Sequence, residues 1–309
     1  NSINSELIYK SWRKINKSLK KKIYLISNYN LLKKQFKKLN YKLKIEKVKN
    51  LNQITAENNL KVIDVNLEFD NAFEVKKTVA SQFVINSLKN AHLLALKNDV
   101  LGIINCPIDK KLLANKNIGV TEYFASRCGL KDNSEVMLIK GKNFSVAPMT
   151  THIDINDVPK KLKKENILKK VKTINNWFKK KYKKKPKIGI LGLNPHNSEF
   201  KRNSEERKII IPAILNLKKR GFKIEGPLVA DTVFINNYKN FDVILGMYHD
   251  QVLAPFKALF KFDAINVTLG LKYLRCSPDH GPAINIIGEK KANPESLINC
   301  INFINKFGK

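Results

Sequence analysis

Three of the five histidines in the 309-residue chain directly follow short apolar runs that are typical of buried strands: His152, His196 and His249. In an α/β sheet the carboxyl ends of parallel strands meet at one edge, so the three imidazoles are candidates for a common site. Neutral imidazoles suit Zn²⁺, Co²⁺, Ni²⁺ or Fe²⁺ better than Mg²⁺, and three protein ligands leave positions open for substrate oxygens. On the residues alone, the alternative that each histidine serves an unrelated loop or core stays open.

Ionisable side chains near these runs add candidates for proton transfer and anion binding. Asp250 stands next to His249, where a carboxylate can orient water or take a proton. Asp231 ends another apolar run, although aspartate is also a good helix N-cap. Lys257 is a candidate acid, base or anion clamp, against the alternative of one more surface lysine. Arg275 lies between apolar residues and suits a bidentate contact with phosphate or carboxylate.

The elements that must position these residues alternate between strand and helix. Apolar runs at 188–193 and 242–247 predict strands, and residues 209–220 between them have helical spacing that ends at a glycine. A lysine-rich amphipathic pattern predicts one long helix over 158–185. His92 lies within a helical pattern and is interpreted as structural. The order of elements predicts an α/β fold with a mixed or largely parallel sheet.

Composition narrows the class of protein. The chain has 58 Lys and Arg against 26 Asp and Glu, a formal charge of +32. Lysines run through the whole chain and arginine is scarce, so we interpret the excess as a solvated surface that attracts anionic substrates; we do not expect a nucleic-acid partner. Four cysteines without C-x-x-C spacing favour a reducing compartment, and no apolar run is long enough to predict a membrane span. We therefore expect a cytoplasmic protein.

Several motifs together resemble the 4-hydroxythreonine-4-phosphate dehydrogenase family of vitamin B6 synthesis. The motifs are Thr-Thr-His at 150–152, Asn-Pro-His at 194–196, Gly-Pro-Leu-Val-Ala-Asp-Thr at 226–232, Tyr-His-Asp-Gln at 248–251, Pro-Phe-Lys at 255–257, Asn-Val-Thr-Leu-Gly at 266–270 and Ser-Pro-Asp-His-Gly at 277–281. The resemblance covers most of the chain.

This resemblance implies two α/β domains flanking a cleft, as in isocitrate and isopropylmalate dehydrogenases. The first domain would comprise residues 1–118 with 271–309, and the second would comprise residues 119–270. The family is homodimeric, with the active site at the subunit interface, and its ligands can come from both subunits. The implied reaction is the NAD- and metal-dependent oxidation of 4-phosphooxy-L-threonine to 2-amino-3-oxo-4-phosphooxybutanoate. This product loses CO₂ to give 3-amino-2-oxopropyl phosphate, in the synthesis of pyridoxal 5'-phosphate.

Site residues carried over by the resemblance fall into four groups. The metal ligands are His152, His196 and His249; Zn²⁺ is the favoured ion, with Co²⁺ and Mg²⁺ as alternatives. Substrate contacts are Thr121, Lys257, Asn266 and Arg275. Lys257, Asp250 and Asp231 are the candidate acid–base residues, between which the sequence does not choose. A loop with His280, Gly281, Ala283 and Asn293 is similar to the adenosine-binding loop of the wider superfamily, which predicts a role in NAD binding.

The chain also departs from the family pattern. Val120 replaces a histidine that the family places before its Thr-Glu pair, residues 197–201 are not rich in glycine, and Asn285 stands where the superfamily often has Asp. We further expect that the family's first strand would precede Ser2 and that part of a sheet is missing.

Three alternatives remain. The first is a sister dehydrogenase for another phosphorylated four-carbon hydroxy acid, 4-phosphoerythronate or threonate 4-phosphate. The second is a basic nucleic-acid-binding protein on a degenerate dehydrogenase fold, and the third is an inactive scaffold.

Overall fold

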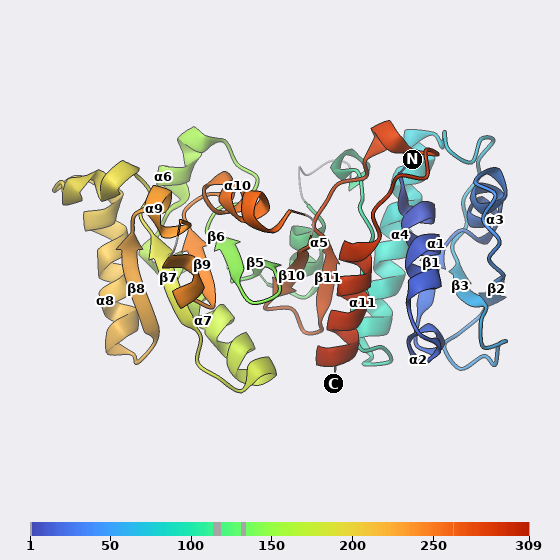
Figure 1. The fold of residues 1–309 in the computed structure, drawn as a ribbon, viewed down its shortest axis with the longest axis horizontal. Coiled ribbons are helices and arrows are strands. Elements are labelled where there is room, and N and C mark those ends of the chain that lie inside the picture. The colour runs from blue at the N-terminus through green and yellow to red at the C-terminus, as the bar shows by residue number, and fades with distance from the viewer. Residues whose placement is uncertain (1, 114–118, 131–133, 236, 262, 309) are drawn as a thin grey trace. The chain divides into compact units, whose positions relative to one another are not determined.

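The computed structural model describes residues 2–113, 119–130, 134–235, 237–261 and 263–308. The chain divides into two compact units, which Figure 1 draws with their elements labelled. Unit 1 consists of Asn1–Arg127 and Lys272–Lys309, and unit 2 of Cys128–Leu271. The sequence predicted the first domain boundary at 118/119. The structure divides the chain after Arg127, so helix α5 (Val120–Arg127) lies in unit 1 and not in the second domain. Strands and helices alternate in both units, which confirms the α/β class.

Unit 1 holds two sets of parallel strands among its described residues. One set has the order β1-β3-β2, and in the other β4 pairs with β11. The strands are β1 (Tyr24–Ser27), β2 (Ile45–Val48), β3 (Leu60–Asp64), β4 (Ile103–Ile104) and β11 (Arg275–Pro278). Besides α5, the helices are α1 (Asn4–Lys14), α2 (Lys17–Lys21), α3 (Tyr29–Lys38), α4 (Lys77–Leu96) and α11 (Glu295–Phe307).

The core of unit 1 is built largely by its terminal helices. Leu7 and Trp12 of α1 pack with Leu297 of α11 and with Leu60 and Val62 of β3. Apolar side chains three, four or seven residues apart lie on one face of a helix, which is why α1 and α11 can each bury a stripe. His92 on α4 is buried and its Nδ1 lies 2.6 Å from the Tyr273 hydroxyl. The interpretation of His92 as a structural residue therefore agrees with its surroundings.

Unit 2 contains a sheet with the strand order β10-β5-β6-β9-β7-β8. Its strands are β5 (Val136–Lys140), β6 (Ser145–Pro148), β7 (Lys187–Leu191), β8 (Lys223–Leu228), β9 (Val243–Gly246) and β10 (Ile265–Leu269). Strands β6, β9, β7 and β8 are neighbours and run parallel, whereas β5 is antiparallel to both β6 and β10. The carboxyl ends of four adjacent strands consequently lie along one edge of this sheet.

Helices of unit 2 pack on this sheet through aromatic and branched side chains. They are α6 (Val158–Lys161), α7 (Lys164–Tyr182), α8 (Ile211–Lys219), α9 (Ala230–Val233) and α10 (His249–Phe260), and a π-helical turn, Glu206–Ile210, leads into α8. Phe256 of α10 is fully buried against Phe144, next to β6. The single helix predicted over 158–185 is wrong: Leu162 and Lys163 are extended, which separates α6 from α7 and buries Leu162.

Candidate active site

Four parallel strands of unit 2 each lead into one of the predicted site segments. In spatial order, β6 leads to His152, β9 to His249, β7 to His196 and β8 to Asp231. Neighbouring strands lie about 4.8 Å apart, so residues that follow adjacent strands at the same edge can share one ligand. The fold of unit 2 thus brings the predicted segments to a common edge, which we call the histidine edge.

His152 and His249 form the closest pair at the histidine edge. Their ring centroids are 5.6 Å apart and the rings are tilted by 40°. Two imidazoles on one tetrahedral Zn²⁺, each with a bond of roughly 2.0 Å, place their ring centres about 5 Å apart. The pair therefore fits a divalent cation of the kind that imidazole favours.

Asp250 orients the second ring of this pair. The Nδ1 atom of His249 lies 2.6 Å from the Asp250 carboxylate, and the carboxylate itself is largely exposed. A metal-binding histidine commonly donates one ring N–H to a carboxylate, which leaves the other nitrogen for the ion. This contact directs the free nitrogen of His249 to be Nε2.

His196 stands apart from the pair. It opens a turn, Pro195–Phe200, in which residues 196–200 all have φ between 48° and 56°. This left-handed conformation is costly for residues with a Cβ, and the turn leaves the His196 side chain exposed. Among the described residues no group of three or more His, Cys, Asp or Glu side chains is close enough to hold a metal ion.

A buried carboxylate that sequence reasoning missed anchors the segment leading to His196. Glu206 is fully buried and accepts hydrogen bonds from the backbone N–H groups of Leu193 and Asn194, both at 2.8 Å, and from the Asn194 side chain. Burial alone would raise the pKa of Glu206, but these hydrogen bonds outweigh it and lower the pKa below its usual value. The one sequence feature that could have indicated this role is an acidic residue in the first turn of the helical segment that leads into α8.

The remaining unit 2 candidates are spread over three elements. Lys257 is exposed on α10, two turns after His249, and Asp231 is exposed on α9. Asn266 lies on β10, and its side-chain Oδ1 is buried without a hydrogen-bond partner among the described residues. A buried acceptor of this kind fits a ligand that donates a hydrogen bond.

Thr121 and Arg275 come together in unit 1. The Arg275 guanidinium is buried and donates to the Thr121 hydroxyl at 3.2 Å and to the Asn105 side chain at 2.7 Å. Burial lowers the pKa of Arg275 to about 10, so the side chain still carries its charge at neutral pH. The sequence predicted both residues as substrate contacts, and their adjacency fits a shared anionic group.

The predicted NAD segment runs from β11 into α11. His280 donates from Nδ1 to the Gly281 carbonyl at 3.0 Å, and its Nε2 atom is buried without a hydrogen-bond partner in the described part of the chain. Ala283 has a left-handed backbone, and Asn293 accepts a hydrogen bond from the Glu295 N–H. Glu6 and Lys10 of α1 hold this segment through the backbone of Ala292. The unpaired Nε2 atom and the exposed backbone fit a polar cofactor.

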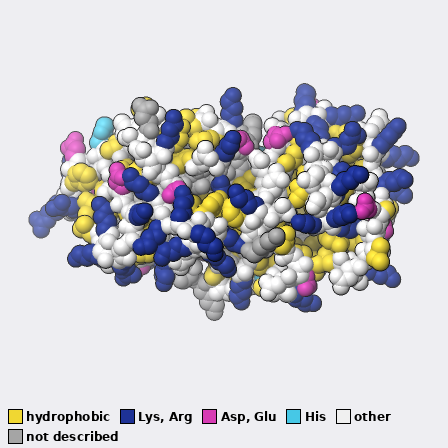
Figure 2. Space-filling model, turned by 60° about the horizontal axis from the view of Figure 1, so that its bottom comes forward, with side chains coloured by type: hydrophobic (Ala, Val, Ile, Leu, Met, Phe, Trp, Pro, Cys, Tyr) yellow, Lys and Arg dark blue, Asp and Glu magenta, His cyan; other side chains and the backbone are white. Residues whose placement is uncertain are grey.

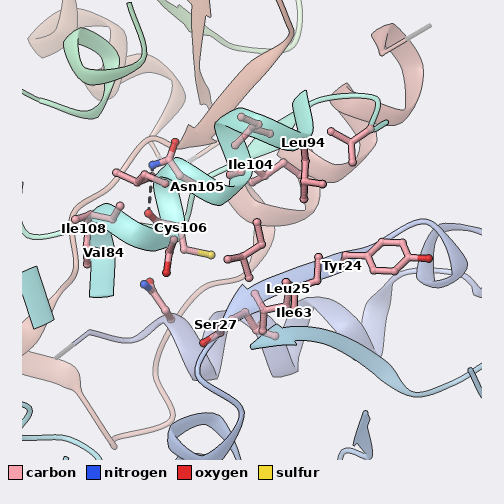
Figure 3. Close-up of a pocket in the computed structure, with 18 of the residues that line it drawn as sticks. Tyr24, Leu25, Ser27, Ile63, Val84, Leu94, Ile104, Asn105, Cys106 and Ile108 are labelled. Atoms are coloured by element: carbon pink, nitrogen blue, oxygen red, sulfur yellow. Dashed lines mark hydrogen bonds between the residues drawn. The ribbon is translucent and has the colours of Figure 1, made fainter. Parts of the chain in front are cut away.

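A separate cavity of 260 Å³ lies in unit 1 between β1, β4 and α4 (Figure 3). Its lining is mostly apolar, and Leu25, Ile63 and Ile104 point into the region that Figure 3 shows. Burial raises the pKa of the Cys106 thiol in this lining to about 12, which keeps it from acting as a thiolate nucleophile. None of the predicted site residues lines this cavity.

Positive charge is distributed over the surface. Figure 2 shows Lys and Arg side chains scattered over the face in view, interleaved with apolar and neutral residues. Among the described residues no helix is long and apolar enough to pass through a bilayer.

Comparison with known proteins identifies the family of this chain. Residues 18–304 match the family model of the pyridoxal phosphate biosynthetic protein PdxA. The chain belongs to the PdxA family.

Individual relatives agree with this assignment. The chain is 40% identical to a 4-hydroxythreonine-4-phosphate dehydrogenase of Sulfurihydrogenibium sp. (strain YO3AOP1) over 247 residues, which is 78% of this chain and 74% of the relative. It is 43% identical to the enzyme of that name from Aquifex aeolicus, over 68% of this chain and 66% of the relative. The crystal structure of 4-hydroxythreonine-4-phosphate dehydrogenase from Klebsiella pneumoniae matches with a TM-score of 0.84 and 25% identity, over 100% of this chain and 96% of that one.

Proposed function

We propose that the chain is an NAD- and divalent-metal-dependent 4-hydroxythreonine-4-phosphate dehydrogenase that serves pyridoxal 5'-phosphate synthesis. It would oxidise 4-phosphooxy-L-threonine to 2-amino-3-oxo-4-phosphooxybutanoate, which decarboxylates to 3-amino-2-oxopropyl phosphate. The observation that carries the proposal is the pair of imidazoles, His152 and His249, at the carboxyl edge of parallel strands in a member of the PdxA family. The relatives' names supply the substrate.

In this proposal His152, His249 and His196 hold the cation, and Zn²⁺ is the favoured ion. A bound divalent cation supplies Lewis-acid chemistry, which lowers the pKa of a hydroxyl that it contacts. Asp250 keeps the His249 ring in the tautomer that leaves Nε2 available. Because His196 lies outside the pair, we propose a homodimer in which ligands come from both subunits.

The proton of the reacting hydroxyl needs a base. Asp250 contacts His249, and Lys257 and Asp231 are the other candidates for this step. The Arg275 guanidinium, held in place by Thr121 and Asn105, would bind a phosphate or carboxylate oxygen of the substrate. The segment that contains His280, Gly281, Ala283 and Asn293 would bind NAD. An excess of positive charge over the surface draws the phosphorylated substrate toward the protein.

The specific alternative is a sister dehydrogenase, which Val120 at the start of α5 keeps open because the family has a histidine there. The test measures NADH formation by the purified chain with 4-phosphooxy-L-threonine and, separately, with 4-phosphoerythronate. We expect faster turnover with the phosphothreonine, loss of turnover with a chelator, and recovery with Zn²⁺ or Co²⁺. Turnover only with the phosphoerythronate would support the sister enzyme, and turnover unaffected by the chelator would contradict the metal proposal.

A further inference from the structure

The backbone of one residue and the side chain of another connect three of the strand ends at the histidine edge. Met247, the residue after β9, is fully buried, and its carbonyl accepts hydrogen bonds from the Thr150 backbone N–H at 3.2 Å and the Thr150 hydroxyl at 2.9 Å. The Met247 N–H donates to the side-chain carbonyl of Gln251 at 2.6 Å. Thr150 lies two residues before His152 and Met247 two residues before His249, so the Met247 carbonyl links the segments of two imidazoles.

The Gln251 amide extends this connection to the third strand. Its Nε2 atom donates to the Gly192 carbonyl at 2.7 Å, just beyond the end of β7 and four residues before His196. Gln251 itself is two residues after His249 on α10. A single half-buried side chain therefore joins the end of β9 to the end of β7 and, through Met247, to the segment that follows β6.

Glycine makes the space that this arrangement requires. A Cβ at Gly246 would lie 2.5 Å from the Val252 side chain and 3.0 Å from the Gln251 Oε1 atom. The first distance is too short for a real Cβ contact and the second is tighter than most, so α10 and the Gln251 amide approach β9 this closely because residue 246 has no side chain. The sequence motif Gly-Met-Tyr-His-Asp-Gln thus contains the glycine that leaves space for the amide, the methionine whose backbone links two segments, and the glutamine that joins the strand ends.

The two contacts of Gln251 demand both a donor and an acceptor at the end of a side chain of this length. An amide offers one carbonyl acceptor and an NH₂ donor, which neither a carboxylate nor an apolar chain provides. Asparagine has the same groups but is one methylene shorter and cannot span both contacts from the same backbone. The geometry is therefore selective for glutamine.

We propose that Gln251 is a positioning residue that fixes the segments of His152, His249 and His196 relative to one another, so that their imidazoles can serve as ligands of a divalent cation. This inference rests on the proposed function, because it assigns those imidazoles to a cation. Gln251 acts on the cation through the backbone of Met247 and Gly192 and does not touch the cation itself. Groups that orient metal ligands in this indirect way typically change metal affinity about ten- to a hundredfold when they are removed.

The experiment titrates Co²⁺ into the purified 309-residue chain and follows the visible absorption of the bound ion. The Gln251→Met variant keeps the length and shape of the side chain and removes both hydrogen bonds. We expect its Co²⁺ dissociation constant to rise at least tenfold and its absorption bands to shift, because the ligand geometry changes. Thermal unfolding of each variant reports separately on folding.

Gln35 provides the matched control. It lies on α3 of unit 1, is half-buried, and its Nε2 donates to the Ala72 carbonyl at 2.7 Å, as Gln251 does to Gly192. We expect Gln35→Met to lower the melting temperature without a change in Co²⁺ affinity or spectrum. Equal effects of the two substitutions on Co²⁺ affinity would overturn the positioning role, since a general loss of stability would then explain both.

Two further variants separate the possible failures. If the wild type and His249→Ala bind Co²⁺ equally, the proposed metal site itself is wrong. If binding depends on His249 but Gln251→Met binds like the wild type, only the positioning role is overturned. Should Gln251→Met not fold, Gln251→Asn decides: the proposal expects weaker Co²⁺ binding in this variant, and wild-type affinity and spectrum would overturn it.

Discussion

The histidine edge of unit 2 and the 280–293 segment of unit 1 are held in different ways. At the histidine edge, polar side chains fix the backbone: buried Glu206 accepts from two peptide N–H groups, and half-buried Gln251 joins two strand ends. The 280–293 segment is irregular and largely exposed, and Glu6 and Lys10 hold it at Ala292. Buried and half-buried side chains thus set the backbone at the histidine edge, as a proposed metal site needs, whereas contacts with the N-terminal residues and the apolar core hold the 280–293 segment.

The largest effect should come from a ligand of the closer pair. We expect His249→Ala to lower kcat/KM about a thousandfold, because a metal ion contributes several kcal/mol to stabilising the reacting oxygen. In contrast, Asn293→Ala in the 280–293 segment should raise the KM for NAD and leave Co²⁺ affinity unchanged. Steady-state kinetics and Co²⁺ titration of both variants check this. A loss of Co²⁺ binding in Asn293→Ala would contradict the separation of the two regions.

Glycine substitutions provide the next contrast. A Cβ at Gly192 would lie 1.9 Å from the Asn197 Oδ1 atom and 3.2 Å from Glu206, so Gly192→Ala should cost about 3 kcal/mol of unfolding free energy. At Gly281 no atom of the described residues lies within 4 Å of the added Cβ. Gly281→Ala should change the stability by less than about 0.5 kcal/mol. Urea unfolding measures both, and equal costs would mean that the two regions are packed alike.

Replacing the buried carboxylate should have a smaller effect that depends on pH. Glu206→Gln removes a charge that two peptide N–H groups stabilise, and near neutral pH it should cost about 2 kcal/mol. The pKa of Glu206 is lowered from 4.5 by folding, so its stabilising contribution is present above that pH and is lost as the pH falls through the folded value. The difference between wild type and variant should therefore shrink below pH 4.5.

Glu206→Gln has a matched control variant in unit 1. Glu6 is also buried and accepts from the Ala292 N–H at 2.8 Å, so Glu6→Gln tests a buried carboxylate away from the histidine edge. We expect Glu206→Gln, but not Glu6→Gln, to weaken Co²⁺ binding. Unchanged Co²⁺ affinity in Glu206→Gln would show that the segment before His196 does not need this anchor.

The smallest effect concerns the left-handed turn that starts at His196. Ser198 has φ 52°, a conformation that glycine adopts without strain, so Ser198→Gly should raise the unfolding free energy by about 0.5 kcal/mol. Ser87→Gly, within helix α4, should lower it by a similar amount of about 0.5 kcal/mol. Thermal unfolding distinguishes the two signs. A loss of stability in Ser198→Gly would contradict the left-handed turn.

The strands that lead to the histidine edge could be predicted from the sequence because each is a short apolar run. Apolar runs before His152 and His249 indicated strands, and parallel strands must end at one edge, so the pairing of these rings followed. The segment after β7 was harder, since five successive left-handed residues without glycine follow no local preference. His196 was accordingly expected with the other two rings, yet it stands apart.

Other elements were missed because their signal lies in tertiary contacts. Gln251 was visible in the motif, but only the packing of α10 on β9 and β7 reveals what its amide contacts. The sequence did not single out Glu206, which is fully buried. Strand β3 escaped detection because Lys61 interrupts its apolar pattern, and this lysine is buried with its ammonium over the Tyr24 ring at 4.0 Å.

X-ray absorption at the zinc K-edge of the Zn²⁺-loaded protein decides whether the histidine edge binds a metal ion, because it counts the imidazoles around the ion. We expect a first shell of nitrogen and oxygen near 2.0 Å with imidazole scattering from at least two rings, reduced by one ring in His249→Ala. A shell of oxygen alone, or an imidazole signal that the substitution leaves unchanged, would contradict it.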